Sequence, residues 1–143
     1  MTSYRECLLL VTILWVVLLG CDSSPRLVPA TGSVVVNGKP AEGAIVMLHP
    51  ADATMATASA VAEADGTFTV VSGGEPGLVA GRYKVTVIWP DPSKKPTQAQ
   101  IMMGTAEPGP DLLKGKYALK STTPLTAEIT SSTTTLPPFE FKR

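Results

Sequence analysis

The stretch Gly81-Arg82-Tyr83-Lys84-Val85-Thr86-Val87-Ile88-Trp89 decides the fold class of this chain, because apolar and polar residues alternate through it. Successive side chains of an extended strand point to opposite faces of the sheet. The odd-numbered residues from Tyr83 to Trp89 therefore share one face, and the even-numbered residues from Arg82 to Thr86 share the other. The pattern predicts a β-strand whose apolar face lines a core.

Further short runs of β-favouring residues lie on both sides of this strand. No stretch from residue 31 onward shows a sustained 3.6-residue apolar period over the length of a helix. The runs predict six more strands, at residues 32–36, 44–49, 57–63, 67–71, 125–129 and 139–141. The sequence therefore predicts an all-β domain over residues 31–143, a seven-stranded antiparallel sandwich with Greek-key connections.

Gly, Asn, Asp and Pro residues separate these runs. Asn37-Gly38 and Asp65-Gly66 predict tight turns, because these residue types tolerate positive φ. Pro137-Pro138 cannot donate hydrogen bonds to a ladder, which predicts that the last strand is short or lies at a sheet edge.

The N-terminus carries an apolar run from Cys7 to Leu19 in which Thr12 is the one polar residue. This run is shorter than the ~20 residues that a helix needs to cross a bilayer. Its length suits the apolar region of a signal peptide, although Glu6 offsets much of the positive charge of Arg5. We expect residues 1–20 to form a signal-peptide helix ahead of the domain.

The run ends in Leu18-Leu19-Gly20-Cys21, which resembles the lipobox of bacterial lipoproteins. The resemblance implies that a signal peptidase recognises Leu18, Leu19 and Gly20, that residues 1–20 are removed, and that Cys21 receives lipid on its sulfur. An uncleaved anchor helix and an ordinary secretory signal are the alternatives, but neither explains a Cys at this place. On the lipobox interpretation no second Cys remains for a disulfide or a metal site.

The residues that follow, 21–30, are rich in Ser and Pro and predict a linker after the lipidated Cys. Nine extended residues reach at most ~30 Å. We therefore expect the domain to stand outside the cytoplasm and close to the membrane that holds its lipid anchor.

The body of the chain also resembles a known family. Gly32-Ser33-Val34, Asn37-Gly38-Lys39-Pro40, Gly43-Ala44-Ile45-Val46, Asp65-Gly66-Thr67-Phe68 and Gly81–Val87 follow one another as in the carboxypeptidase regulatory-like, or transthyretin-like, β-sandwich domain. With the lipobox and the late stretch from Lys116-Tyr117 to Thr126, the chain resembles small lipoproteins of planctomycete bacteria. The resemblance implies an accessory role, since the regulatory domain is named for its place beside a catalytic domain.

Composition excludes some function classes. Twelve Lys and Arg residues balance twelve Asp and Glu residues, so the formal net charge is zero and a nucleic-acid partner is not expected. Transthyretin-like folds also include hydroxyisourate hydrolases, whose site needs more than one His and a Tyr-Arg-Gly-Ser ending. This chain has one His and ends Phe141-Lys142-Arg143, so we expect no enzyme and no cofactor.

Individual polar residues give weak signals. His49 lacks a second His or a Cys to share a zinc ion, and we expect a solvated residue at a strand end. Glu63 and Asp65 fall short of the ~6 to 8 oxygens of a calcium site, so they are assigned to the turn.

Two other features of the sequence also give weak functional signals. The Gly-rich residues 72–77 lack the Lys-Ser/Thr ending of a phosphate loop and predict a turn. Glu128 and Glu140 are spaced, outward-facing strand residues with nothing that marks a general acid and base.

The long connection 90–124 is the remaining candidate, because connections beyond ~12 to 15 residues are usually functional or disordered. Its apolar residues Ile101, Met102 and Met103 predict either a partner-binding loop or core residues that cover one open end of the sandwich. A short turn of helix is expected at 111–116. Trp89 beside the loop is a candidate for glycan stacking, but its register with Val87 favours a place in the core or at its rim.

Together these observations predict a lipid-anchored, non-enzymatic binding or spacer module of the bacterial cell envelope, tied to the membrane through Cys21. Two alternatives stay open. One is a carbohydrate-binding envelope module, and the other is an accessory subunit of an envelope peptidase or transporter.

Overall fold

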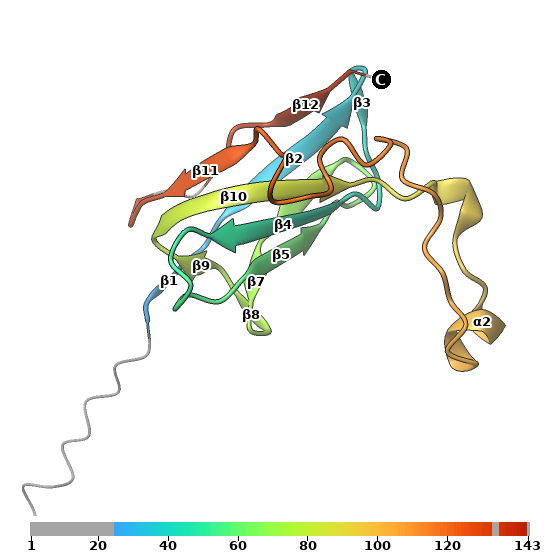
Figure 1. Cartoon of the computed structure of the whole chain (residues 1–143), viewed down its shortest axis with the longest axis horizontal. Helices are drawn as coiled ribbons and strands as arrows, with labels where there is room; N and C mark the ends of the chain where they lie inside the picture. The colour runs from blue at the N-terminus through green and yellow to red at the C-terminus, as the bar shows by residue number, and fades with distance from the viewer. Residues whose placement is uncertain (1–24, 133–134, 143) are drawn as a thin grey trace, which may run out of the picture.

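The computed structural model describes residues 25–132 and 135–142. The expected signal-peptide helix, the recognition residues Leu18, Leu19 and Gly20, and the lipidation site Cys21 all lie outside the described residues. Strands make up most of the regular structure (Figure 1). None of the helices in residues 25–132 and 135–142 is both long and apolar enough to pass through a membrane.

The larger sheet has the strand order β11-β10-β4-β5-β7-β8, and all its neighbouring strands are antiparallel. β10 and β4 share the longest ladder, which runs from Tyr83 opposite Pro50 to Ile88 opposite Ile45. The strands are β4 (Ile45–Pro50), β5 (Ala58–Val61), β7 (Val71–Ser72), β8 (Glu75–Pro76), β10 (Gly81–Ile88) and β11 (Thr126–Ile129).

The smaller sheet has the order β12-β2-β3, and β6 also pairs with β2. Its strands are β2 (Thr31–Val36), β3 (Lys39–Pro40), β6 (Thr67–Thr69) and β12 (Phe139–Phe141). A separate pair joins β1 (Leu27–Val28) to β9 (Leu78–Val79).

The buried apolar residues of both sheets form one core cluster. Val34 on β2 is fully buried, as are Leu48 on β4 and Val85 on β10. Phe68 stacks on Phe139 with ring centroids 6.2 Å apart. The alternation read from residues 81–89 is confirmed for Tyr83, Val85 and Val87, which are all buried, and the all-β prediction is confirmed with it.

Two turns show why their residue types are needed. Asn37 and Gly38 have φ values of 51° and 75° between β2 and β3, as the Asn-Gly pair predicts. Gly66 has φ 79°, and a Cβ there would lie 2.7 Å from the carbonyl oxygen of Val34. The second turn is therefore tied to the core as well as to local backbone geometry.

One pair of strands departs from the wholly antiparallel prediction. β12 is parallel to β2, with Phe139 opposite Val34 and Phe141 opposite Val36. The connection after β11 carries the chain to the other sheet, where Leu136 N donates to Thr31 O at 2.7 Å before β12 begins. β12 therefore runs beside β2 in the same direction as β2. β12 is three residues long and ends its sheet, as Pro137-Pro138 predicts.

Two segment boundaries also differ from the prediction. The strand expected at 67–71 is divided into β6 and β7, which belong to different sheets. The expected linker 21–30 is in part built into the body, because β1 pairs with β9 and because Val28 and Ala30 are buried in the core. Two adjacent apolar residues, Leu27 and Val28, are too few to predict a strand.

The outer edge of β10 is completed by a loop. β11 pairs with β10 only from Gly81 to Lys84. Beyond that, Val85 N donates to Leu125 O and Val87 N donates to Tyr117 O, both at 3.0 Å. The buried Thr123 hydroxyl donates to Val85 O at 2.7 Å. The second half of the long connection is therefore a structured part of the body.

Candidate functional site

The first half of the long connection forms an arm, defined here as residues 90–110. It leaves the body directly after β10, and Figure 1 shows it extending away from both sheets to a tip that carries α2. None of its residues is buried. The arm contains a 3-10 helix, η1 (Pro92–Lys94), and one α-helical turn, α2 (Gln98–Met102).

The two ends of the arm are joined by backbone pairing. Asp91 N donates to Pro110 O at 3.0 Å, and Leu112 N donates to Trp89 O at 2.8 Å. Pro90 and Asp111 form an isolated antiparallel bridge between these bonds. The arm therefore has a closed, ladder-like base.

The Asp111 carboxylate fastens this base to the body. Its Oδ1 accepts hydrogen bonds from Trp89 N and Leu113 N, each at 2.9 Å, and its Oδ2 accepts from Gly115 N at 2.8 Å. Leu113, held by this carboxylate, is buried in the core cluster. One side chain thus connects the end of β10, the arm and the core.

The tip of the arm is defined by three exposed apolar residues. Ile101 is 53% exposed, Met102 85% and Met103 73%, although large apolar side chains are usually buried in a core. The prediction that they are core residues covering an open end of the sandwich is wrong. The arm turns away from the sheets after η1, so the tip has no core to enter.

Local hydrogen bonds hold α2 without help from packing. The Thr97 hydroxyl accepts from Gln100 N, and the Gln100 side chain accepts from Thr97 N at 2.8 Å, which is a capping box. Gly104, with φ 67°, ends the helix. The helical turn expected at 111–116 is wrong, because those residues form hydrogen-bonded turns around Asp111.

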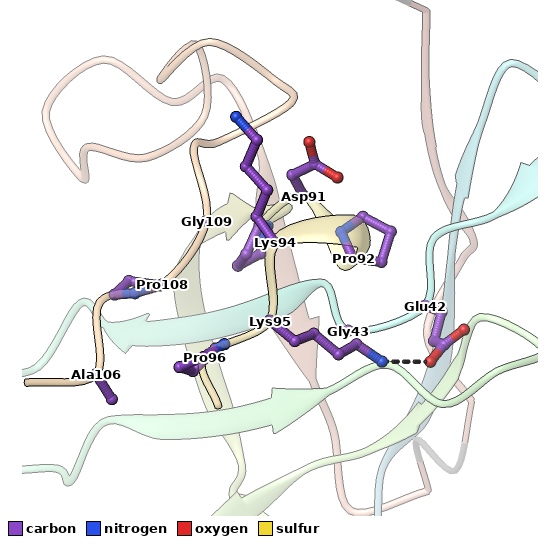
Figure 2. A pocket seen from close by; sticks show the side chains of 11 residues that line it. Glu42, Gly43, Asp91, Pro92, Lys94, Lys95, Pro96, Ala106, Pro108 and Gly109 are labelled. Atoms are coloured by element: carbon purple, nitrogen blue, oxygen red, sulfur yellow. Dashed lines mark hydrogen bonds and ion pairs between the residues drawn. The ribbon is translucent and has the colours of Figure 1, made fainter. Parts of the chain in front are cut away.

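A pocket of about 340 Å³ lies where the arm approaches the body (Figure 2). The Lys95 ammonium and the Glu42 carboxylate form an ion pair of 2.9 Å at its side. Both side chains are half exposed or more, so the pair contributes little stability. The pocket is lined largely by proline and other uncharged residues, namely Gly43, Pro90, Pro92, Pro96, Ala106, Pro108 and Gly109.

Trp89 lies at the rim of the core. Its ring packs against the core cluster, and its Nε1 donates to Glu42 O at 3.1 Å. The rim position expected from its register with Val87 is confirmed. The indole N–H is thus bonded within the body, and the packing of the ring against the core leaves less of its surface for stacking on a sugar.

His49 differs from the solvated loop residue that its sequence context predicts. It is the last but one residue of β4 and is half-buried. Its Nε2 lies 3.0 Å from the Thr86 hydroxyl oxygen, and Thr86 is itself buried. Burial, together with the charge of Lys120, lowers the pKa of His49 below its usual value. No pattern in the sequence indicated that His49 and Thr86 would pair on the outer face of the sheet.

Asp65, considered with Glu63 as a calcium ligand, instead stabilises its own turn. Asp65 accepts from Thr67 N at 2.8 Å and from the Thr67 hydroxyl at 2.6 Å. These bonds lower the pKa of Asp65. Within residues 25–132 and 135–142, no group of three or more His, Cys, Asp or Glu side chains is placed to hold a metal ion.

The other residues considered for a functional site, the Gly-rich segment and two glutamates, lie in separate parts of the structure. Residues 72–77 form the predicted turn, in which Gly73 and Gly74 have φ values of 61° and 90° between β7 and β8. Glu128 lies on β11 and faces Arg82 at 3.9 Å, whereas Glu140 lies on β12 of the other sheet.

Sequence reasoning missed Asp111 as the residue that fastens the arm. A usable signal was present, because Asp followed by Gly four residues later favours a turn in which the carboxylate binds nearby backbone N–H groups. Comparison with known proteins gives no match: no family model, no curated protein and no solved structure is significantly similar to this chain.

Proposed function

We propose that this chain is a lipid-anchored, non-enzymatic module of the bacterial cell envelope that holds its β-domain near a membrane and uses the arm as its contact element. The observation that carries the contact role is the tip, where three large apolar side chains are exposed on a helical turn with closed caps. Exposed apolar groups of this kind usually mark an interaction site.

The anchor is supported by the sequence around Cys21. An apolar run of signal-peptide length ends at Leu18-Leu19-Gly20-Cys21, and a polar Asp-Ser-Ser-Pro segment follows at once. Acyl chains on Cys21 would each contribute ~0.8 kcal/mol per buried methylene to membrane attachment. In this proposal Leu18, Leu19 and Gly20 are read by the signal peptidase and residues 1–20 are removed as a helical signal peptide.

The finer fold assignment belongs to the same proposal. In this proposal the chain is a seven-stranded Greek-key sandwich whose principal strands are β2, β4, β5, β6, β10, β11 and β12, and the support for it is the strand order of the two main sheets. The proposed kinship with carboxypeptidase regulatory-like domains and with planctomycete lipoproteins rests on the sequence motifs alone. β12 beside β2 makes the sandwich mixed rather than wholly antiparallel.

A non-catalytic role is supported by how the polar side chains are used. His49 binds Thr86, Asp65 binds its own turn, and Asp111 binds three backbone N–H groups. These groups stabilise the fold, and none of them faces the pocket of Figure 2. The proposal therefore assigns no cofactor and no nucleic-acid partner.

Metabolic labelling with a fatty-acid probe in a bacterial host tests the anchor. The wild-type chain and Cys7→Ala should carry the label, because Cys7 lies in the segment removed on processing. Cys21→Ala should carry none and should leave the membrane fraction or keep its signal segment. Label retained by Cys21→Ala, at equal expression, would contradict the anchor.

Crosslinking with mass spectrometry in intact cells distinguishes the accessory-subunit alternative. Recurrent links from Lys94 or Lys95 on the arm to one envelope protein, with fewer from Lys114 and Lys116, would favour an accessory subunit. The carbohydrate-binding alternative predicts glycan affinity that Trp89→Ala abolishes without unfolding the domain. Its support is weaker, since the Trp89 ring is packed on the core and its N–H is bonded to Glu42 O.

A further inference from the structure

We propose that the tip, Ile101, Met102 and Met103, inserts into the surface of the same lipid bilayer that anchors Cys21. The occupant of the exposed apolar surface is thus lipid, and the chain contacts its membrane at two places. This inference rests on the anchor under the proposed function, because a domain held at Cys21 stays within reach of the bilayer.

Charge distribution along the arm favours lipid. Residues 96–106 contain no Asp, Glu, Lys or Arg, whereas Lys94 and Lys95 precede this segment and Glu107 follows it. Entry of a charged side chain into the bilayer interior is costly, and Lys side chains can remain at the interface while apolar neighbours enter. The uncharged segment includes α2 and the turn that follows it.

Backbone hydrogen bonding at the tip also suits a membrane surface. Polar backbone groups that enter lipid must be bonded internally. Gln100 N binds the Thr97 hydroxyl, Ile101 N binds Thr97 O at 3.0 Å, and Met103 N binds Ala99 O at 2.9 Å. At the other end of the turn, Thr105 N binds Gln100 O at 2.9 Å. The tip therefore exposes apolar side chains from a backbone in which these four N–H groups are bonded internally.

The placement of the arm matches the placement of the anchor. In the view of Figure 1, the start of the described chain at β1 lies at the lower left and α2 at the lower right, with β8 of the larger sheet between them on the same lower side. β1 is fixed to the body by its pairing with β9. From Leu27 back to Cys21, six residues span at most ~20 Å, so the bilayer lies close to that lower side.

The size of the tip favours lipid over a protein partner. A stable protein interface usually covers ~800 Å² on each partner, which two side chains at the end of a five-residue helix and one on its C-cap residue cannot supply. A membrane surface requires less, because the anchor already keeps the tip at a high effective concentration near the bilayer. The tip then acts as a second, weaker contact that orients the domain.

Fluorescence of a single labelled residue tests this inference. Met102→Cys in the full-length lipoprotein gives one free thiol, because processing removes Cys7 and acylates Cys21. An environment-sensitive dye on this thiol is measured after reconstitution into vesicles of phosphatidylethanolamine and phosphatidylglycerol with spin-labelled lipid. Leu119→Cys, also exposed at 60% but outside the arm, is the matched control.

The expected result is a blue-shifted emission and strong quenching by spin-labelled lipid for the dye at residue 102, and neither for the dye at residue 119. Ile101→Asp in the Met102→Cys background should reverse both changes. A dye at residue 102 that stays water-exposed on vesicles, or that becomes shielded only when envelope protein is added, would overturn the inference.

Failure of the anchor is distinguished by the same samples. Flotation of the vesicles and the mass of the acylated N-terminal peptide report attachment at Cys21 independently of the dye. Acylated protein that floats with a water-exposed tip leaves the anchor in place and refutes the tip insertion alone. Protein that carries no acyl chains refutes the proposed function.

Discussion

β10 and the arm follow one another directly in the chain, yet they are stabilised in different ways. Four of the eight residues of β10 are buried, and the strand is bonded along both edges. The arm has no buried residue, and its order comes from the Asp111 carboxylate, the backbone bonds at its base and the caps of α2. Packing stabilises the first region, whereas local hydrogen bonds stabilise the second.

The difference places folding stability in β10 and the proposed contact with other molecules in the tip. Residues of β10 determine whether the domain folds, because their side chains form the core. Residues of the tip can change with little effect on folding, because their side chains are largely exposed. Substitutions in the two regions should therefore give distinct results, which the following predictions test in order of decreasing effect.

The largest effect is expected from removing a core side chain. Leu48 is fully buried opposite Val85, so Leu48→Ala should lower the free energy of unfolding by about 2–5 kcal/mol. Ile101→Ala in the tip removes similar apolar volume and should change it by less than ~0.5 kcal/mol. Urea denaturation of both variants checks the contrast, and equal losses would show that the tip packs against the body.

The next largest difference in stability is expected between alanine substitutions at two glycines. Gly66 and Gly104 have φ values of 79° and 67°, so alanine is strained by ~1–2 kcal/mol at either place. At Gly66 the new Cβ would also lie 2.7 Å from Val34 O, whereas at Gly104 it would meet open space. Thermal unfolding should therefore show a clearly larger loss for Gly66→Ala.

Asp111 tests the link between the two regions. Asp111→Ala leaves the N–H groups of Trp89, Leu113 and Gly115 without this acceptor, and we expect a loss of about 1–3 kcal/mol. Amide exchange should rise most at Trp89 and Leu113. Asp111→Asn keeps one carbonyl oxygen for these two donors and should fall between the alanine variant and the wild type. Unchanged exchange in Asp111→Ala would show that backbone pairing alone holds the arm.

The smallest effect concerns pH. Burial lowers the pKa of His49 from its ordinary 6.5, so the unfolded chain binds a proton more readily than the folded chain. Stability should therefore decrease as pH falls from above 6.5 toward the lowered pKa, and stay flat at higher pH. Urea midpoints measured above the titration range of the carboxylates check this, with His49→Gln as the control that should lose the dependence.

The predictability of the fold followed the strength of the local pattern. Residues 81–89 alternate over a long stretch, and Asn37-Gly38 specifies its turn chemically, so both were predicted. Thr86 was assigned to the polar face of the strand but is buried, and its hydroxyl oxygen lies 3.0 Å from Nε2 of His49 on β4. A contact with a distant segment leaves no trace in local periodicity.

The candidate site was predictable only in part. The length of the connection and its apolar residues identified Ile101, Met102 and Met103, but not whether they would enter the core. A run of three apolar residues fits either outcome, and the direction of the arm is set at its base by Asp111. Its role in fastening the arm was missed because Trp89, 22 residues away, becomes its neighbour only when the arm closes.

The sequence by itself determined the β class and the tight turns, because both depend on neighbouring residues and their conformational preferences. Tertiary structure alone decided the parallel entry of β12 beside β2, the burial of Thr86 and the exposure of the tip. These features depend on contacts between residues far apart in the chain, and such contacts are fixed by how the sheets pack and where the loops cross them.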